Sequence, residues 1–168
     1  MNIEVRRSVR EDAAAICRVL RESITGCCSA DHHDDPEILS RWLSNKTIEN
    51  VEMWVNASNS VAFVALREGQ VLGVSLISGE ELALCYVVPE ALHQGAGKAL
   101  LQSAENAAFA RGVDSLKLES TRTALPFYSR NGFLADGSLR RWAGLEAQPM
   151  SKMLLANNPL HRSACGVR

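Results

Sequence analysis

The fold of this chain is decided by the stretch Val87-Val88-Pro89-Glu90-Ala91-Leu92-His93-Gln94-Gly95-Ala96-Gly97-Lys98-Ala99-Leu100. An apolar strand ends before Pro89, a loop with two glycines follows, and a helical pattern begins at Gly97 and continues to Arg111. Such a junction aims free backbone N–H groups and the positive end of a helix dipole at one point. Phosphate binds well at such a point, and glycine lets its oxygens approach the backbone closely.

Two commoner phosphate loops do not fit this stretch. The Walker pattern GxxxxGK[ST] requires glycine at position 92 and Ser or Thr at position 99, where Leu92 and Ala99 stand. The dinucleotide pattern GxGxxG requires Gly or Ala at position 100, which Leu100 occupies. Neither a nucleoside triphosphate nor NAD is therefore favoured. A plain strand-to-helix turn remains as the alternative to a phosphate site.

The chain before this stretch predicts helices followed by an antiparallel hairpin. Residues 3–7 alternate apolar and charged side chains as a half-buried strand does, and Ser8-Val9-Arg10-Glu11 matches the capping box that opens a helix. We expect residues 26–35 to form a polar loop. The predicted elements are a strand at 3–7, helices at 8–24, 36–42 and 47–55, hairpin strands at 61–66 and 71–77, and a strand at 82–88.

The chain after this stretch completes a single sheet. The pattern predicts strands at 116–118, 133–135 and 149–154, and a short helix that carries Phe127 and Tyr128. The resulting order, β-α-α-β-β-β-α-β-α-β-β, predicts an α/β fold with one mixed, mostly antiparallel twisted sheet flanked by helices. We expect one domain at residues 1–155 and a mobile tail at 156–168.

Composition narrows the class of protein. The net charge is −1 and 46% of the residues are hydrophobic, so no overall field would attract nucleic acid or an anionic membrane. The N-terminus lacks the apolar run of a signal peptide, and no stretch is long enough to span a membrane. The cysteines are odd in number and show no CxxC spacing, which favours a reducing, cytoplasmic setting. They are Cys17, Cys27, Cys28, Cys85 and Cys165.

Two segments resemble the GNAT superfamily of acyl-CoA-dependent N-acyltransferases. Residues 86–101 are similar to its signature of a strand, a proline, a pyrophosphate loop ending in GxG and a helix that opens with Leu-Leu. Residues 121–133 are similar to its late helix, in which an alanine precedes a Phe-Tyr pair and Gly-Phe follows. The resemblance covers most of residues 3–154 in element order. It implies a GNAT-like fold and transfer of an acetyl group from acetyl-CoA to a primary amine of a small molecule or peptide.

The resemblance also implies a cofactor site. The main chain of Val87 and Val88 would bind the pantetheine amides, and the loop at 93–99 would hold the pyrophosphate. The full set of implied cofactor residues is Tyr86, Val87, Val88, His93, Gln94, Gly95, Ala96, Gly97, Lys98, Ala99 and Thr123. Two positions depart from the family pattern. Leu92 stands where the family has Gln or Arg, although Gln94 gives a shifted match, and Thr123 stands where the family often has Asn.

The chemistry requires a proton acceptor and a donor. A lysine-like amine is mostly protonated at neutral pH, so a base must accept its proton, and Glu81 is our candidate. A solvated turn carboxylate is the alternative for Glu81 and for Glu80. By resemblance, Tyr128 is the general acid beside the sulfur. Because complete proton transfer from tyrosine to a thiolate is uphill by about 2 kcal/mol, we expect Tyr128 to stabilise the developing thiolate as a hydrogen-bond donor. The amide of Val87 or Val88 would polarise the thioester carbonyl.

The acceptor side is predicted at the segment between the first two helices, again by resemblance. The acidic loop at 31–35 would attract a cationic amine, and the candidate acceptor-binding residues are Asp31, His32 and Trp42. Adjacent His32 and His33 do not complete a tetrahedral metal site, so no metal is expected. Homodimerisation is plausible by resemblance only. A non-catalytic acyl-CoA-binding sensor is the alternative function, but such a sensor has no use for an acid at Tyr128.

Overall fold

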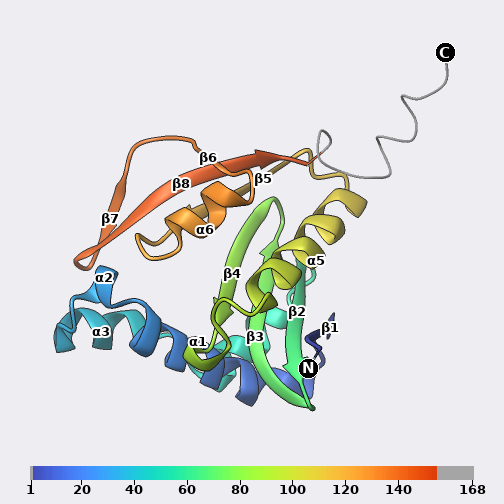
Figure 1. Ribbon diagram of the computed structural model, residues 1–168, viewed down its shortest axis with the longest axis horizontal. Coiled ribbons are helices and arrows are strands. Elements are labelled where there is room, and N and C mark those ends of the chain that lie inside the picture. Colours follow the sequence, from blue (N-terminus) through green and yellow to red (C-terminus); the bar gives the residue numbers. More distant parts are fainter. Residues whose placement is uncertain (1, 155–168) are drawn as a thin grey trace.

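The computed structural model describes residues 2–154, which form one open sheet with helices on both faces (Figure 1). The strands are β1 (Glu4–Arg7), β2 (Ser60–Arg67), β3 (Gln70–Ser78), β4 (Glu81–Val87), β5 (Ser115–Ser120), β6 (Leu134–Ala135), β7 (Arg140–Trp142) and β8 (Leu145–Met153). The helices are α1 (Ala13–Cys27), α2 (Ser29–His32), α3 (Pro36–Leu43), α4 (Ile48–Val55), α5 (Ala96–Ala110) and α6 (Leu125–Arg130).

The strand order is β1-β2-β3-β4-β5-β8-β6, with β7 paired to β8. The predicted hairpin is confirmed as β2 and β3, whose turn places Glu68 and Gly69 at φ values of 52° and 78°. Positive φ at both central residues gives the turn the twist that antiparallel strands need. All pairings are antiparallel except that of β4 with β5, so the predicted mixed, mostly antiparallel sheet is confirmed.

The parallel pair β4–β5 opens almost as soon as it forms. Its only register pair is Glu81 with Lys117, where the Lys117 N–H donates to the Glu80 carbonyl at 2.9 Å. From there β5 continues along β8 while β4 stays with β3, and the two strands diverge in Figure 1. The carboxyl end of β4 therefore faces an opening instead of a neighbouring strand.

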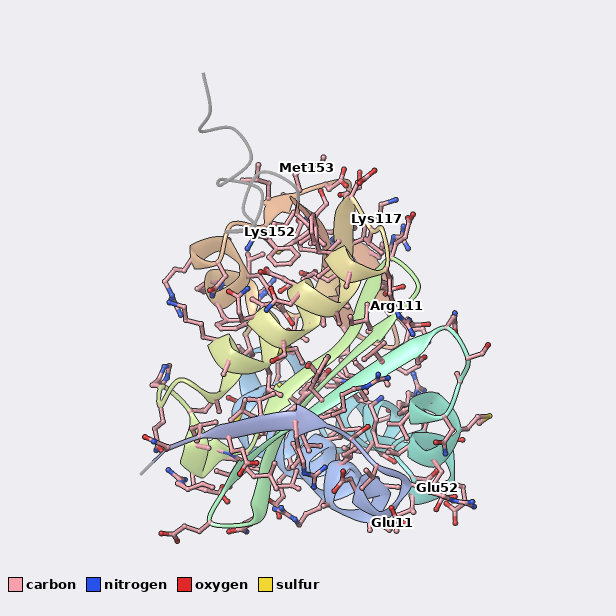
Figure 2. All side chains as sticks on the ribbon, turned by 90° about the vertical axis from the view of Figure 1, so that its right-hand side faces the viewer. Glu11, Glu52, Arg111, Lys117, Lys152 and Met153 are labelled. Atoms are coloured by element: carbon pink, nitrogen blue, oxygen red, sulfur yellow. The ribbon has the colours of Figure 1, made fainter. Side chains whose placement is uncertain are left out.

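Helices α1 and α5 cover opposite faces of the first half of the sheet (Figure 2). On the α5 face, the Ser75 hydroxyl donates to the Leu100 carbonyl at 3.2 Å. A Cβ at Gly73 would lie 2.8 Å from Leu100 Cδ1, so the glycine lets α5 approach β3 closely. At the far end of α5, Lys152 Nζ binds Glu105 Oε1 at 2.7 Å and so links the helix to β8.

The first helix begins later than the sequence predicts. Ser8 donates its N–H to the Ala62 carbonyl and so prolongs the strand edge. The cap forms one residue further on, where the Val9 N–H donates to the Asp12 carboxylate at 2.8 Å. Arg6 binds the same carboxylate and, with the hydrogen bond from Val9, holds the pKa of Asp12 below its ordinary value. A short helical turn at Arg10–Asp12 therefore precedes α1, and the capping box predicted at Ser8 is wrong.

The polar loop predicted at residues 26–35 is also wrong. Helix α1 continues to Cys27 and α2 follows, with Asp31 only 6% exposed and His32 fully buried. The His32 ring makes two hydrogen bonds: Nδ1 accepts the Asp34 N–H, and Nε2 lies 3.0 Å from the Ile24 carbonyl. Buried polar groups are tolerated when they are bonded in this way. Composition alone could not show that these partners exist.

The last strands differ from the prediction in the hairpin that β7 and β8 form. Strand β7, with the sequence Arg140-Arg141-Trp142, was not predicted because it has no apolar alternation. It pairs with the start of β8 through a turn at Ala143 and Gly144, both with positive φ. Strand β8 consequently begins at Leu145, ahead of the predicted Pro149. The expected tail at 156–168 lies outside the described residues. Within residues 2–154, no helix has the length and apolar character that crossing a membrane requires.

Candidate active site

The loop before α5 presents unpaired amides. Gly95 caps the helix at φ 91° and has no side chain to accept a hydrogen bond from it. The Ala99 N–H is the first to bond back, to the Gly95 carbonyl at 3.0 Å. The amides of Ala96, Gly97 and Lys98 belong to the first turn, where an α-helix offers no internal acceptor. Free amides at the positive end of a helix dipole attract anions, so the phosphate site predicted at this loop stays a prediction.

The side chains beside this loop have different partners. Gln94 folds back, donating from Nε2 to the Glu90 carbonyl at 2.9 Å and accepting a hydrogen bond from Arg67. His93 and Lys98 are exposed at the loop surface. Arg67, the last residue of β2, brings a further positive charge to the loop. Sequence reasoning missed Arg67 because nothing in its own segment relates it to the phosphate loop.

The backbone of Val87 and Val88 points in opposite directions. The Val88 N–H donates to the Leu72 carbonyl on β3 at 2.9 Å. In an antiparallel pair the next residue turns its N–H and C=O the other way, so those of Val87 face the opening beside β5. The Cys27 thiol reaches the Val87 carbonyl from α1 at 3.9 Å. Of the two amides predicted to polarise a thioester, only that of Val87 is directed to the opening.

Tyr128 reaches this opening from α6. Its ring is packed edge-on between Phe127 and Phe133, with centroids 5.2 and 5.6 Å away. Its hydroxyl is hydrogen-bonded with the Cys85 thiol on β4, and burial raises the pKa of Tyr128 well above its ordinary value. Burial likewise raises the pKa of Cys85 to about 12. Tyr128 therefore keeps its proton and remains a donor at the strand edge where β4 and β5 separate.

A pocket of about 280 Å³ lies on the other face of β4, bounded by α2, α3, β5 and the β7–β8 hairpin. Side chains alternate along a strand, so Tyr86 faces this pocket while Cys85 faces Tyr128. The Tyr86 hydroxyl is hydrogen-bonded to Trp42, and burial raises the pKa of Tyr86. Trp142 supplies a third aromatic wall. The pocket and Tyr128 thus lie on the two sides of the same strand edge.

The carboxylates of this pocket differ in how firmly they are held. Asp31 accepts hydrogen bonds from the amides of Arg122 and Thr123, at 2.7 and 3.2 Å, and from the Thr123 hydroxyl. Glu146 is paired with Arg122 at 2.9 Å. Glu119 is paired only with Arg140, at 2.6 Å, and the Arg140 side chain is 71% exposed. Glu119 is therefore the pocket carboxylate that exchanges partners most readily.

The predicted site residues are only partly brought together. Asp31 and Trp42 line the pocket, whereas His32 is buried behind it with its ring edge-on to Trp42 at 6.3 Å. The Thr123 hydroxyl donates a hydrogen bond to the Asp31 carboxylate. Glu81 lies outside the pocket at the start of β4, roughly 16 Å from Tyr86 along an extended strand.

The three aspartates of the acidic segment at 31–35 also lie in different surroundings. Asp35 caps α3 by accepting the Glu37 N–H at 2.9 Å, and the Asp34 side chain is exposed to solvent. Asp31 alone of the three lines the pocket. The predicted acidic loop is thus a folded segment whose carboxylates serve different partners.

The remaining candidate groups do not add a second chemistry. Cys28 is buried, and burial raises its pKa to about 12, so its thiol is a poor nucleophile. Cys27 is partly exposed, but burial raises its pKa as well. Among residues 2–154 no three His, Cys, Asp or Glu side chains lie close enough together to hold a metal ion.

Comparison with known proteins agrees with this geometry. Residues 30–154 match the family model described as "Acetyltransferase (GNAT) domain". The fold is similar to that of a GCN5-related N-acetyltransferase from Rhodopseudomonas palustris, with TM-score 0.80, 21% identity, and 91% of this chain and 96% of that chain covered. It is also similar to the PaiA N-acetyltransferase from Thermoplasma acidophilum in complex with coenzyme A, with TM-score 0.76, 23% identity, and 91% and 99% covered. Comparison with curated proteins gives no match.

Proposed function

Because the chain belongs to the GNAT acetyltransferase family, we propose that it transfers an acetyl group from acetyl-CoA directly to a primary amine of a small molecule or peptide. The observation that carries this proposal is the position of Tyr128. Its hydroxyl contacts Cys85 on β4 beside the opening, and the pocket lies on the other face of the same strand. A donor on one side of the strand edge and a pocket on the other allow both substrates to meet there in a ternary complex.

Acetyl-CoA would lie along the opening between β4 and β5. The amides of Ala96, Gly97 and Lys98 would hold the pyrophosphate, with the positive charges of Lys98 and Arg67 beside it. The Val87 amide would bond the pantetheine or the thioester carbonyl. The raised pKa of Tyr128 suits a donor that stabilises the departing thiolate while keeping its own proton until late in the reaction.

The acceptor amine would enter the pocket lined by Tyr86, Trp42 and Trp142. An alkylammonium group is attracted both by aromatic faces and by carboxylates. We assign the proton acceptor to Glu119, because it lines this pocket and Glu81, the candidate from sequence, does not. A reducing compartment belongs to the proposal, since Cys17, Cys27, Cys28 and Cys85 are all free thiols.

Thiol release from acetyl-CoA over a panel of amines, with wild type and Tyr128→Phe compared, tests the function. We expect turnover with at least one amine and a loss of kcat of about 100-fold in Tyr128→Phe, a size usual for removal of one transition-state donor. Phe127→Leu, which alters the neighbouring ring without removing a hydroxyl, is the matched control and should retain most of the activity.

The sensor alternative makes the opposite forecast in the same experiment. A protein that only senses acyl-CoA would bind CoA in calorimetry and release no thiol with any amine. Binding without turnover, or equal rates for wild type and Tyr128→Phe, would therefore count against the enzymatic proposal.

A further inference from the structure

A second cavity, of about 410 Å³, lies between α4 and the strands β2, β3 and β4. It is separated from the acceptor pocket, since it opens over Leu76 and Leu84 and not over the gap beside β5. Met53 and Trp54 line it from α4, which forms its roof, and the hydroxyl-bearing residues Ser60 and Ser78 line it from the paired ends of β2 and β3. A volume of this size accommodates a small organic ligand.

The unusual member of this cavity is Lys46. The residue is only 8% exposed, and its ammonium donates to Asn45 Oδ1 at 2.6 Å and to the Trp42 carbonyl at 3.3 Å. The Trp54 ring lies 5.9 Å away. No carboxylate in the described part of the chain forms an ion pair with it. Burial lowers the pKa of Lys46, and no neighbouring charge offsets that effect.

A buried cation without a counter-ion favours an anionic ligand. Neutral acceptors satisfy part of the hydrogen bonding of Lys46 but leave its charge uncompensated in a partly desolvated position. An ammonium has three donors, and the hydrogen bonds to Asn45 and Trp42 leave one for an incoming anion. Among the described residues that line this cavity, Lys46 is the only basic one, so the charge to be matched is a single one.

We propose that this cavity binds a small monoanionic carboxylate with an aromatic or aliphatic body, with Lys46 as its counter-ion. The carboxylate lies at Lys46 and the hydroxyls of Ser60 and Ser78, while the apolar body lies between Leu76, Leu84 and the α4 roof. A phosphate monoester carries more charge than one lysine neutralises and suits the cavity less. The site is distinct from the acyl-transfer site and does not depend on the proposed acetyl transfer.

Isothermal titration calorimetry with phenylacetate tests the site. We expect saturable binding to the wild-type chain and at least about tenfold weaker binding to Lys46→Met, because a hydrogen bond to a charged group is lost. The matched control is Lys117→Met, an exposed lysine of β5 that Figure 2 places at the opposite end of the molecule from Glu52 on α4. It should bind phenylacetate as the wild type does.

Further probes and a second variant keep the result decisive. Phenylacetamide, which has the same shape without the charge, and phenyl phosphate should both bind more weakly than phenylacetate. Ala83→Leu adds bulk to the cavity from an exposed position and keeps Lys46, and it should abolish binding even if Lys46→Met folds poorly. The proposal is overturned if phenylacetate does not bind the wild type, if Lys46→Met or Ala83→Leu binds it equally well, or if phenyl phosphate binds more tightly.

Discussion

At the scale of single residues, the identity of the general base is where our expectation from the sequence and our proposal from the structure differ most. Sequence points to Glu81, because it precedes the strand that leads to the cofactor loop. In the structure Glu81 lies where β4 and β5 are still paired, before the opening begins. Glu119, two residues beyond Lys117 on β5, lines the proposed acceptor pocket after the strands have separated. We therefore propose Glu119, the carboxylate beside the opening, as the base.

Replacing Glu119 by Gln should lower kcat by about 100-fold at neutral pH, which is typical of the loss of a general base. The rate should recover in part at high pH, where the amine loses its own proton without help. A pH–rate profile of wild type, Glu119→Gln and Glu81→Gln measures this difference. Glu81→Gln should follow the wild-type profile. If Glu81→Gln shows the loss and Glu119→Gln does not, the base is Glu81 after all.

Residue roles were predictable only where a pattern carries them. The Phe127-Tyr128 pair singled out Tyr128, and the structure brings its hydroxyl to β4. Glu119, our proposed base, could not be identified from a pattern. It alternates with Leu118 as a solvent-facing residue of any half-buried strand does. Asp31 was chosen for its charge, yet its carboxylate holds the loop at Arg122 and Thr123. Burial and partners, which decide such roles, are properties of the folded chain.

At the scale of elements, α5 is the part of the molecule that both sequence and structure define most sharply. A glycine with positive φ lies at each end, Gly95 at 91° before the helix and Gly112 at 82° after it. An added Cβ would meet no atom within 4 Å at either position. The two sites therefore impose the same backbone requirement, but only Gly95 lies at the proposed phosphate site. Strand β7 was missed, by contrast, because its residues carry no periodic signal.

These two glycines give a matched test of the loop. Alanine at either site should destabilise the protein by about 1–2 kcal/mol, the strain of a left-handed conformation for a residue with a Cβ. Gly95→Ala should also raise the KM for acetyl-CoA by about tenfold, because the shifted backbone misdirects the amides of Ala96, Gly97 and Lys98. Gly112→Ala should leave that KM unchanged. Denaturant unfolding and steady-state kinetics measure both effects, and equal KM values would remove the loop from cofactor binding.

At the scale of the whole molecule, the sheet consists of two parts joined at the start of β4 and β5. Sequence patterns predicted the elements of this sheet except α2 and β7, and the sheet topology confirms the single mixed, mostly antiparallel sheet. The opening itself could not be derived from hydrophobic periodicity, because β4 and β5 each have the pattern of an ordinary strand. It depends on β5 pairing with β8 over its whole length while β4 stays paired with β3.

If CoA binds along this opening as we propose, the amides of Val87 and Val88 should respond to it differently. The Val88 N–H is already bonded to Leu72, whereas the Val87 N–H faces the opening without a partner strand. Amide exchange followed by NMR should show Val87 slowed by about tenfold or more when CoA is added, through a new hydrogen bond. Val88 should slow only as far as ligand binding stabilises the whole fold. The ratio of the two exchange rates separates these effects, and a ratio that CoA leaves unchanged would mean that the cofactor does not bind along β4.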